Sequence, residues 1–302
     1  MYISLCDENN DETQKGMSSV IDFKHLIDTA PDMMKLPPEF VLPLSANPFS
    51  VSYAEIPVID LSRLAESSES RISTVKAISS ACELWGFFRI VNHGIDVSLI
   101  AEMLEVAEEF FDLSLMEKMK YSTEDVMSPE YLEHIWELTM KIGSAISEGL
   151  GLDNGYIKKS FGKGFQILAA NYYPPCPEPE KTLGLAAHSD HGALTILMQN
   201  CVNGLQVKHN DQWLLLTMYL ILSNGKYKSV EHRATVNAQK TTISVAVGHG
   251  PELSTVIGPA TQLVDPTKEI QYQPTVYKDY IRLQQTTTIR GKTALQAIRT
   301  SK

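Results

Sequence analysis

The sequence is poor in the features that mark secreted and membrane proteins. It has only four cysteines: Cys6, Cys82, Cys176 and Cys201. Their spacing is not paired, which predicts reduced thiols rather than a disulfide framework. The longest apolar run, Trp213–Leu222, is much shorter than a membrane-spanning helix and is interrupted by Thr217. Residues 1–10 lack the basic and apolar regions of a signal peptide. These absences predict a cytoplasmic protein with no membrane partner.

Positive charge is also scarce relative to negative charge. Lysine and arginine number 26 against 36 aspartates and glutamates, which gives a net charge of -10. Such a chain is poorly suited to binding nucleic acid or an anionic membrane surface. The hydrophobic content is 43% over 302 residues, which is ordinary for a globular protein. We therefore expect one large domain, or a core domain with an N-terminal partner, and the oligomeric state is left open.

The first half of the chain carries mainly helical patterns. Residues 1–50 are expected to form a lead-in, mobile over about residues 1–17, with a short helix at Asp22–Asp28. Residues 51–160 form the next region. Its expected elements are a strand at Ile56–Asp60, a helix at Arg71–Trp85, a strand at Phe87–Val91, and helices at Val97–Phe111 and from Pro129 to about Leu150. The inward face of the first helix is expected to be Ile72, Val75, Ile78 and Cys82.

After Gly162 the pattern changes to short strands separated by glycine, proline and asparagine. The expected strands are Phe165–Tyr173, Ala193–Met198, Gly204–Val207, Trp213–Leu222, Lys226–Val236 and Thr242–Val247. Such strands, with no helices between them, are typical of an antiparallel sandwich or barrel. Residues past Asp265 are expected to form a capping tail, with a terminal helix starting near Tyr277. The region 161–302 makes the fold α+β and mainly β.

Three residues in this second half form a possible metal-binding set. His188 and Asp190 are two residues apart in an extended segment, so their side chains project to the same side. Together with the distant His232 they make the two-histidine, one-carboxylate pattern of non-haem Fe(II) oxygenases. The alternative is a hydrogen-bonded surface pair, which is the commoner origin of an isolated His-x-Asp. The sequence around the pair decides between these interpretations.

Other histidines are not expected to be ligands. His191 adjoins Asp190 and would face the opposite side of a strand. His249 lies in Gly-His-Gly-Pro, which indicates a loop, and His93 lies in Asn-His-Gly, which indicates a turn after a strand. His134 is off the inward face of its helix and is expected to be solvated.

Five segments occur in a defined order from about Leu36 to the end of the chain. They are Ile56–Leu61, Trp85–Gly94, Asn171–Pro177, His188–Asp190 and Leu222–Arg233. In sequence and in order they resemble the plant Fe(II)/2-oxoglutarate-dependent dioxygenases, on the branch that includes flavanone 3-hydroxylase-like and salicylate-hydroxylase-like enzymes.

This resemblance implies a fold and a reaction. The fold would be a double-stranded β-helix, or jelly roll, with flanking helices and a helical N-terminal region. The metal would be Fe(II), with 2-oxoglutarate and O2 as co-substrates and ascorbate as a candidate reductant. 2-Oxoglutarate would become succinate while a small specialised metabolite, often a flavonoid or phenolic compound, is hydroxylated or desaturated. The implied metal ligands are His188, Asp190 and His232. The implied co-substrate contacts are Asn171, Tyr173 and Ser244.

The chain departs from the family's pattern at the co-substrate site. The family holds the far carboxylate of 2-oxoglutarate with the arginine of an Arg-x-Ser motif, and Thr242 stands where that arginine is expected. Lys240 would be a poor substitute, and Arg233 should face away because it adjoins a metal ligand. The chain is also shortened near 126–129 and near 213–222, where the family carries further strands.

Three functional classes are therefore considered. The first is an active oxygenase of the kind just described. The second is an impaired family member that binds metal or ligand without turnover, which Thr242 and the shortened regions favour. The third is an oxygenase that does not use 2-oxoglutarate, as in ACC oxidase-like relatives. Those relatives keep the Arg-x-Ser pair, so the loss of arginine favours this third class only superficially.

Overall fold

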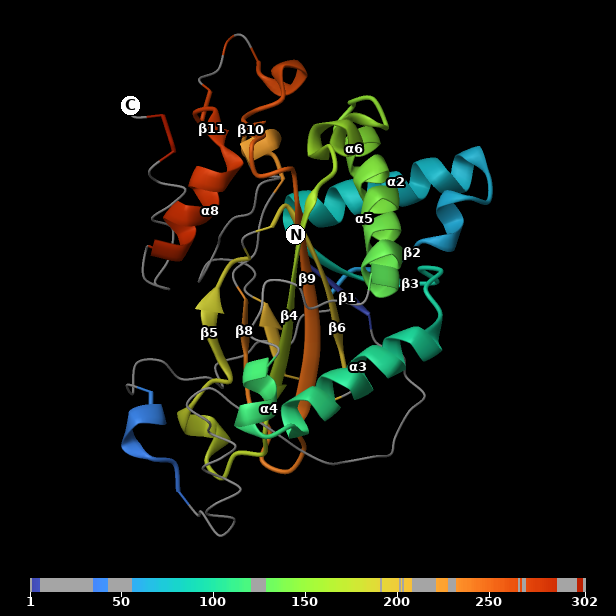
Figure 1. Cartoon of the computed structure of the whole chain (residues 1–302). Coiled ribbons are helices and arrows are strands. Elements are labelled where there is room, and N and C mark those ends of the chain that lie inside the picture. The colour runs from blue at the N-terminus through green and yellow to red at the C-terminus, as the bar shows by residue number, and fades with distance from the viewer. Residues whose placement is uncertain are drawn as a thin grey trace.

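Two β-sheets pack face to face, and helices cover the outside of the larger one (Figure 1). The structure is a computed structural model. It describes residues 2–5, 35–42, 56–120, 129–190, 192–200, 204–207, 221–227, 232–265, 270–286 and 298–300, together with residues 202 and 267. The expected helix at Asp22–Asp28 lies outside the described residues.

The larger sheet has the strand order β2-β3-β1-β6-β9-β4. Its strands are β1 (Tyr2–Leu5), β2 (Val58–Asp60), β3 (Phe87–Val91), β4 (Phe165–Tyr173), β6 (Leu194–Gln199) and β9 (Thr242–Gly250). Strands β4, β9 and β6 pair antiparallel, whereas β2, β3, β1 and β6 pair parallel. The larger sheet thus joins a parallel half to an antiparallel half.

The smaller sheet is antiparallel throughout and has the order β5-β8-β7. Its strands are β5 (Leu185–His188), β7 (Leu205–Val207) and β8 (His232–Ala234). A separate pair is formed by β10 (Val256–Ile257) and β11 (Thr275–Val276). The expected antiparallel sandwich is therefore found in the second half of the chain.

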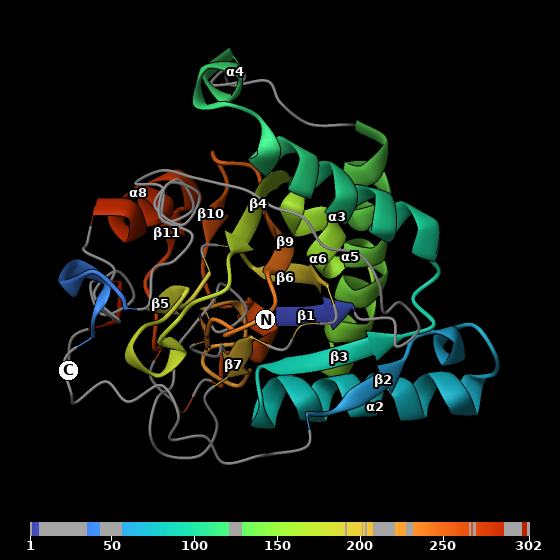
Figure 2. The ribbon, with the colours of Figure 1, turned by 90° about the horizontal axis from the view of Figure 1, so that it is seen from below.

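Helices are α2 (Ser68–Leu84), α3 (Val97–Asp112), α4 (Leu115–Lys120), α5 (Pro129–Gly149), α6 (Tyr156–Phe161) and α8 (Tyr277–Thr286). Short 3-10 turns lie at Pro38–Phe40, Ser62–Leu64, Pro179–Lys181 and Thr261–Leu263. Helix α2 runs beside β2 and β3 (Figure 2), α3 packs on β4 and β9, and α5 contacts α2, α6, β6 and β9. No helix in the described ranges is long and apolar enough to cross a membrane.

The helix starts follow from local capping. The Ser67 side chain accepts a hydrogen bond from the Ser70 backbone N–H, and Asp96 accepts one from the Ser98 backbone N–H. Gly86, with φ of 67°, ends α2 and lets the chain return as β3. The expected helix and strand at these positions are confirmed.

The inward face of α2 differs from the prediction. Ile72 is 69% exposed, whereas Thr74, Ile78, Ala81 and Cys82 are buried. The helix starts at Ser68, and its stripe on the core follows the i, i+4, i+7 spacing from Thr74. Ile72 falls outside that stripe, so the predicted face was wrong at this residue.

Two expected strands differ from the prediction at their described residues. Of Lys226–Val236, only His232–Ala234 is a strand within the described residues. Asn224 and Gly225 both have positive φ (47° and 90°), which turns the chain just before this range. Of Trp213–Leu222, the described residues 221 and 222 are helical, and the rest lies outside the described part of the chain.

The first residues of the chain also differ from expectation. Residues 2–5, placed in a mobile lead-in by their lack of pattern, form β1 between β3 and β6. The strand supplies backbone hydrogen-bonding groups to both neighbours, and joins β2 and β3 to the antiparallel half (Figure 2). Nothing local in four residues signals such a pairing, because it depends on two strand edges far along the chain.

A buried hydroxyl pair links α2 to the segment that precedes β8. The Tyr227 hydroxyl lies 2.7 Å from the Ser79 Oγ, and Tyr227 is only 1% exposed. Replacing Tyr227 with phenylalanine is expected to lower the free energy of unfolding by about 1–2 kcal/mol, because Ser79 loses its short hydrogen bond. Chemical denaturation measures the change. The control Tyr156→Phe, in α6, should change stability by no more than about 0.5 kcal/mol, and an equal loss in both variants would contradict the assignment.

Candidate metal centre

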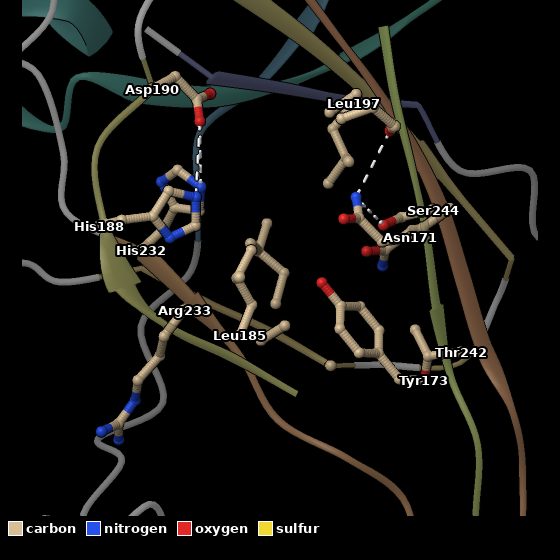
Figure 3. Close-up of a pocket in the computed structure, with 16 residues that line it drawn as sticks. Asn171, Tyr173, Leu185, His188, Asp190, Leu197, His232, Arg233, Thr242 and Ser244 are labelled. Atoms are coloured by element: carbon tan, nitrogen blue, oxygen red, sulfur yellow. Dashed lines mark hydrogen bonds and ion pairs between the residues drawn. The ribbon is translucent and has the colours of Figure 1, made fainter. Parts of the chain in front are cut away.

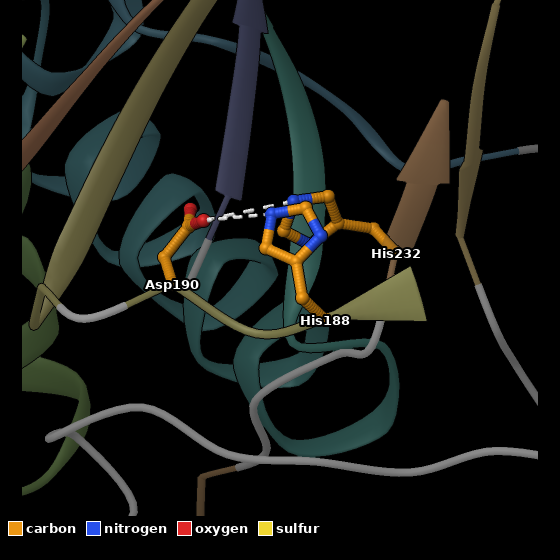
Figure 4. A group of neighbouring side chains, drawn as sticks. All are labelled: His188, Asp190 and His232. Atoms are coloured by element: carbon orange, nitrogen blue, oxygen red, sulfur yellow. Dashed lines mark ion pairs between the residues drawn. The ribbon is translucent and has the colours of Figure 1, made fainter. Parts of the chain in front are cut away.

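The two sheets bring His188, Asp190 and His232 together. His188 ends β5, Asp190 lies two residues beyond it, and His232 begins β8 directly opposite His188. Each residue offers one ligand atom, and these atoms all lie within 4.8 Å of one another (Figure 4). Asp190 Oδ1 is 3.7 Å from His188 Nε2 and 3.6 Å from His232 Nε2. These three residues, the His188–Asp190–His232 cluster, form the one group of this kind among the described residues.

Both imidazoles face the carboxylate through the same ring nitrogen. His188 Nδ1 lies 2.8 Å from the carbonyl oxygen of Ala186, so Nδ1 donates its proton there. This hydrogen bond leaves the lone pair of Nε2 directed at the cluster, as a metal ligand requires. His232 also presents Nε2, and its residue is 5% exposed. The His188 tautomer therefore suits metal binding.

The environment keeps Asp190 ionised. Burial acts to raise the pKa of Asp190, but the neighbouring His232 and His188 act in the opposite direction. The pKa of this carboxyl consequently lies below its ordinary value. A carboxylate and two imidazoles are the ligand set expected for a borderline divalent metal such as Fe(II). The residues present thus fit the metal that the sequence predicts.

A pocket opens beside the cluster, between the two sheets (Figure 3). The far side from the cluster is formed by β4 and β9, whose register places Asn171 opposite Ser244 and Tyr173 opposite Thr242. Asn171 Nδ2 donates a weak hydrogen bond of 3.4 Å to Ser244 Oγ. All the sequence-predicted site residues therefore line one pocket. The sequence did not indicate its apolar walls, which are Ala169, Leu185, Leu197, Leu205 and Ala246.

Thr242 is buried and its hydroxyl is unsatisfied. The residue is 3% exposed, and its Oγ1 has no hydrogen-bond partner in the described part of the protein. Lys240, considered as a substitute cation, is exposed and does not line the pocket. Arg233 follows His232 on β8, and its Nε donates to Gln206 Oε1 at 2.7 Å. Arg233 was expected to face away from the site but lines the pocket, although Figure 3 shows its guanidinium extending away from Thr242.

A second pocket adjoins the first and shares Asp190, Ala169 and Ala246 with it. Its other lining residues are Phe165, Ile167, Gly192, Thr195, Gly248 and Tyr277. Tyr277 comes from the first turn of α8, far along the chain from the metal cluster. Sequence reasoning missed this pocket, because no local pattern in α8 indicates contact with β4 and β9.

The other histidines considered from the sequence fall into three groups. His93 Nδ1 accepts a hydrogen bond from the Ile95 backbone N–H within a turn, and His134 is exposed on α5, both as expected. His249 was predicted in a loop, but the structure places it fully buried in β9. It is paired there with Gln166 of β4 and Leu194 of β6. This pairing on both sides keeps the segment in a strand, although its flanking glycines favour a loop. His191 lies outside the described residues.

Comparison with protein families gives two matches in chain order. Residues 56–140 match the N-terminal region described as non-haem dioxygenase in morphine synthesis. Residues 164–251 match the 2OG-Fe(II) oxygenase superfamily and include the whole cluster.

Individual relatives agree with these matches. Flavanone 3-dioxygenase 2 of Oryza sativa subsp. japonica is 36% identical over 310 aligned residues, covering 82% of this chain and 89% of the relative. Protein DOWNY MILDEW RESISTANCE 6 of Arabidopsis thaliana is 35% identical, covering 84% of this chain and 91% of the relative. The crystal structure of JOX2 in complex with 2OG, Fe and JA superposes with a TM-score of 0.77 at 29% identity, covering 89% of this chain and 95% of JOX2.

The alignments also show that the chain is short relative to this rice enzyme. The match to the rice enzyme spans 310 aligned residues but uses only 82% of the 302 residues here, so that relative contains residues with no counterpart in this chain. The fold, the metal-binding geometry and the extent of the matches nevertheless agree. The chain belongs to the family of plant Fe(II)/2-oxoglutarate-dependent dioxygenases.

Proposed function

We propose that His188, Asp190 and His232 bind Fe(II), and that the chain hydroxylates or desaturates a small plant metabolite of flavonoid or phenolic type. The observation that carries this proposal is the cluster itself, whose three ligand atoms lie within 4.8 Å of one another beside a pocket. Three protein ligands on one face leave coordination positions open for a 2-oxo acid and O2. When bound, Fe(II) supplies the activation of O2 that is coupled to oxidation of the 2-oxo acid.

The protein's own residues would orient these reactants. Ala186 holds the His188 ring in position through its carbonyl oxygen. Asn171 and Tyr173 project polar groups into the pocket from β4 and would contact the co-substrate. Apolar side chains, including the buried Leu197, line the pocket between these two polar ends.

The second pocket is proposed to hold the metabolite. It reaches Asp190 at one end and is lined by Phe165, Ile167 and Tyr277, which suit a flat aromatic molecule. The names of flavanone 3-dioxygenase 2 and of the flavonoid 7-O-demethylase of Ocimum basilicum support a flavonoid-type substrate. Thebaine 6-O-demethylase of Papaver somniferum, 31% identical, widens the class to other specialised metabolites.

A larger side chain in this second pocket should reduce metabolite oxidation without changing metal binding. A Cβ at Gly248 would meet only Ile167 O at 3.8 Å and Thr195 Oγ1 at 3.9 Å, so a side chain there can enter the pocket without a backbone clash. Gly248→Leu is expected to reduce oxidation of a flavonoid substrate at least about tenfold while leaving Fe(II) affinity unchanged. Product chromatography and Fe(II) titration measure the two effects. Gly248→Ala is the size control, and loss of Fe(II) binding in Gly248→Leu would contradict this use of the pocket.

The test of the proposed function is anaerobic titration with Fe(II) and then with 2-oxoglutarate. The weak visible charge-transfer band of the chelated complex reports binding of a 2-oxo acid to the metal. A saturable band supports the proposal and justifies a substrate screen. Binding of Fe(II) without any band, for any 2-oxo acid, would favour the alternative function below.

The alternative is an impaired family member that binds metal or ligand without turnover. The buried Thr242 and the residues of the rice relative that have no counterpart here favour it.

We also propose that the chain divides into a lead-in (1–50), an N-terminal region (51–160) and the jelly-roll domain (161–302). The cytoplasm is the proposed location, supported by the buried thiols of Cys82 and Cys176. Nucleic acid and membranes are not proposed as partners.

A further inference from the structure

The pocket beside the cluster has two chemically different ends. At one end lie the metal-binding residues, and at the other the two strands β4 and β9 contribute Asn171, Tyr173, Thr242 and Ser244 (Figure 3). A 2-oxo acid that chelates the metal through its 2-oxo acid group would direct its tail toward this second end. The four residues there, called the distal set, decide which tails are accepted.

The distal set carries no positive charge. Its polar groups are one amide and three hydroxyls, and burial raises the pKa of Tyr173, so its hydroxyl stays neutral at physiological pH. Among the described lining residues the one lysine or arginine is Arg233, which bonds to Gln206 and extends away from the distal set. A carboxylate tail would therefore be buried among neutral groups, without a described cation beside it.

The Thr242 hydroxyl marks the position of a missing partner. It is buried, it lines the pocket, and it has no hydrogen-bond partner in the described part of the chain. Buried hydroxyls are normally hydrogen-bonded. A tail with an uncharged acceptor, such as an ester or amide carbonyl, satisfies this donor without bringing a charge into the pocket. A carboxylate also satisfies it, but it must give up its hydration without a compensating ion pair.

We propose that the site binds a 2-oxo acid at least as tightly as it binds 2-oxoglutarate when the far end of that acid is uncharged and is a hydrogen-bond acceptor. Thr242 is the residue that sets this preference. The inference rests on the proposed function, because it assumes that the cluster binds a metal and that the 2-oxo acid group chelates it. The tail takes no part in the oxidation and is retained in the product, so a change of tail is compatible with the same chemistry.

The experiment compares three ligands on the full-length, Fe(II)-loaded protein without oxygen. They are 2-oxoglutarate, its 5-methyl ester, which keeps the carbonyl but loses the charge, and 2-oxopentanoate, which loses both. Dissociation constants are taken from the visible charge-transfer band, a readout that does not require turnover. In the wild-type protein the ester is expected to bind at least as tightly as 2-oxoglutarate, and 2-oxopentanoate several-fold more weakly than the ester.

Three variants identify the residue responsible. Thr242→Arg should reverse the preference and favour 2-oxoglutarate over the ester by about a hundredfold, because an arginine pairs with the carboxylate. Thr242→Val keeps the shape of the side chain but not the hydroxyl. In this variant the ester should bind more weakly, with an affinity close to that of 2-oxopentanoate. Thr261→Arg, at an exposed position in a 3-10 turn, adds the same charge elsewhere and should leave every constant unchanged.

The outcomes separate this inference from the proposed function. If wild-type protein binds 2-oxoglutarate more than about tenfold tighter than the ester, the distal set is selective for a carboxylate and the inference is overturned while the proposed function stands. If Thr242→Arg and Thr261→Arg change the constants equally, Thr242 does not face the tail, which also overturns it. If Fe(II) binds but no 2-oxo acid gives a band, the proposed function fails and the inference with it.

Discussion

Replacing Asp190 with asparagine is expected to abolish tight Fe(II) binding. The amide keeps the shape of the side chain but removes the negative charge that lies 3.6 Å and 3.7 Å from the two histidine Nε2 atoms. Two neutral imidazoles alone give an incomplete ligand set for the ferrous ion. The dissociation constant for Fe(II) should rise by more than about a hundredfold, which exceeds the effect typical of residues that only support metal ligands. Anaerobic calorimetric titration measures it.

The matched control is Asp279→Asn, which makes the same change of charge at an exposed position in the first turn of α8. It should bind Fe(II) like the wild-type protein. His188→Ala should behave like Asp190→Asn, whereas His191→Ala should retain Fe(II), because the sequence places His191 on the opposite side of the strand. Retention of Fe(II) by His188→Ala together with its loss in His191→Ala would reassign the ligands.

The cluster shows which part of the site is encoded locally. His188 and Asp190 are two residues apart, so their side chains point to the same side of an extended segment. This follows from the sequence spacing alone, because side chains alternate along an extended chain. The position of His232 is different, because it depends on the pairing of β5 with β8, which joins residues more than forty positions apart. Only the resemblance to a family placed His232 in advance. Long-range strand pairing is the step that local patterns do not specify.

His249 and Tyr277 show the same limit in two other ways. The glycines that flank His249 are poor strand formers, yet pairing on both sides of β9 keeps the backbone extended through Gly250. Tyr277 was expected only as the start of a terminal helix, and that helix is present. Its place in the second pocket depends on how α8 docks, which a helical pattern does not encode. Most helices and strands were thus predictable, except β1 and the end of β9, and contacts between distant elements were not.

Thr242 differs from the residue of the family at this position, and the physical consequence of this difference is visible only in the structure. The sequence identified it as the residue that stands where the family has an arginine. The structure adds that its hydroxyl is buried, unsatisfied and part of the same pocket as the cluster. An exposed threonine at this position would carry no argument about ligand choice, because water would satisfy its hydroxyl.

Acid is expected to destabilise this protein through His249 in particular. His249 is fully buried, and burial lowers its pKa from 6.5 to about 4, despite hydrogen bonds to the backbone of Leu194 and Val247 that act in the opposite direction. Its Nε2 accepts from Gln166 Nε2 at 3.0 Å, which also requires the neutral ring. Because the unfolded chain takes up the proton first, the stability that neutral His249 contributes is complete above about pH 6.5 and declines as the pH falls toward 4. The loss should reach about 3 kcal/mol.

The variant that isolates this effect is His249→Gln, compared with wild type by urea denaturation of the metal-free protein between pH 7 and pH 4. The glutamine variant is expected to be less stable at pH 7, because it loses the ring packing beside Trp136, but its stability should fall less as the pH is lowered. His134→Gln, on the exposed face of α5, removes one histidine without removing a buried one and should keep the wild-type slope. Parallel curves for wild type and His249→Gln would show that His249 takes up no proton on unfolding, and that the acid sensitivity comes from the cluster or from the carboxylates. If the two stability curves instead converge as the pH falls, the acid sensitivity is assigned to His249, which lies in β9 between β4 and β6.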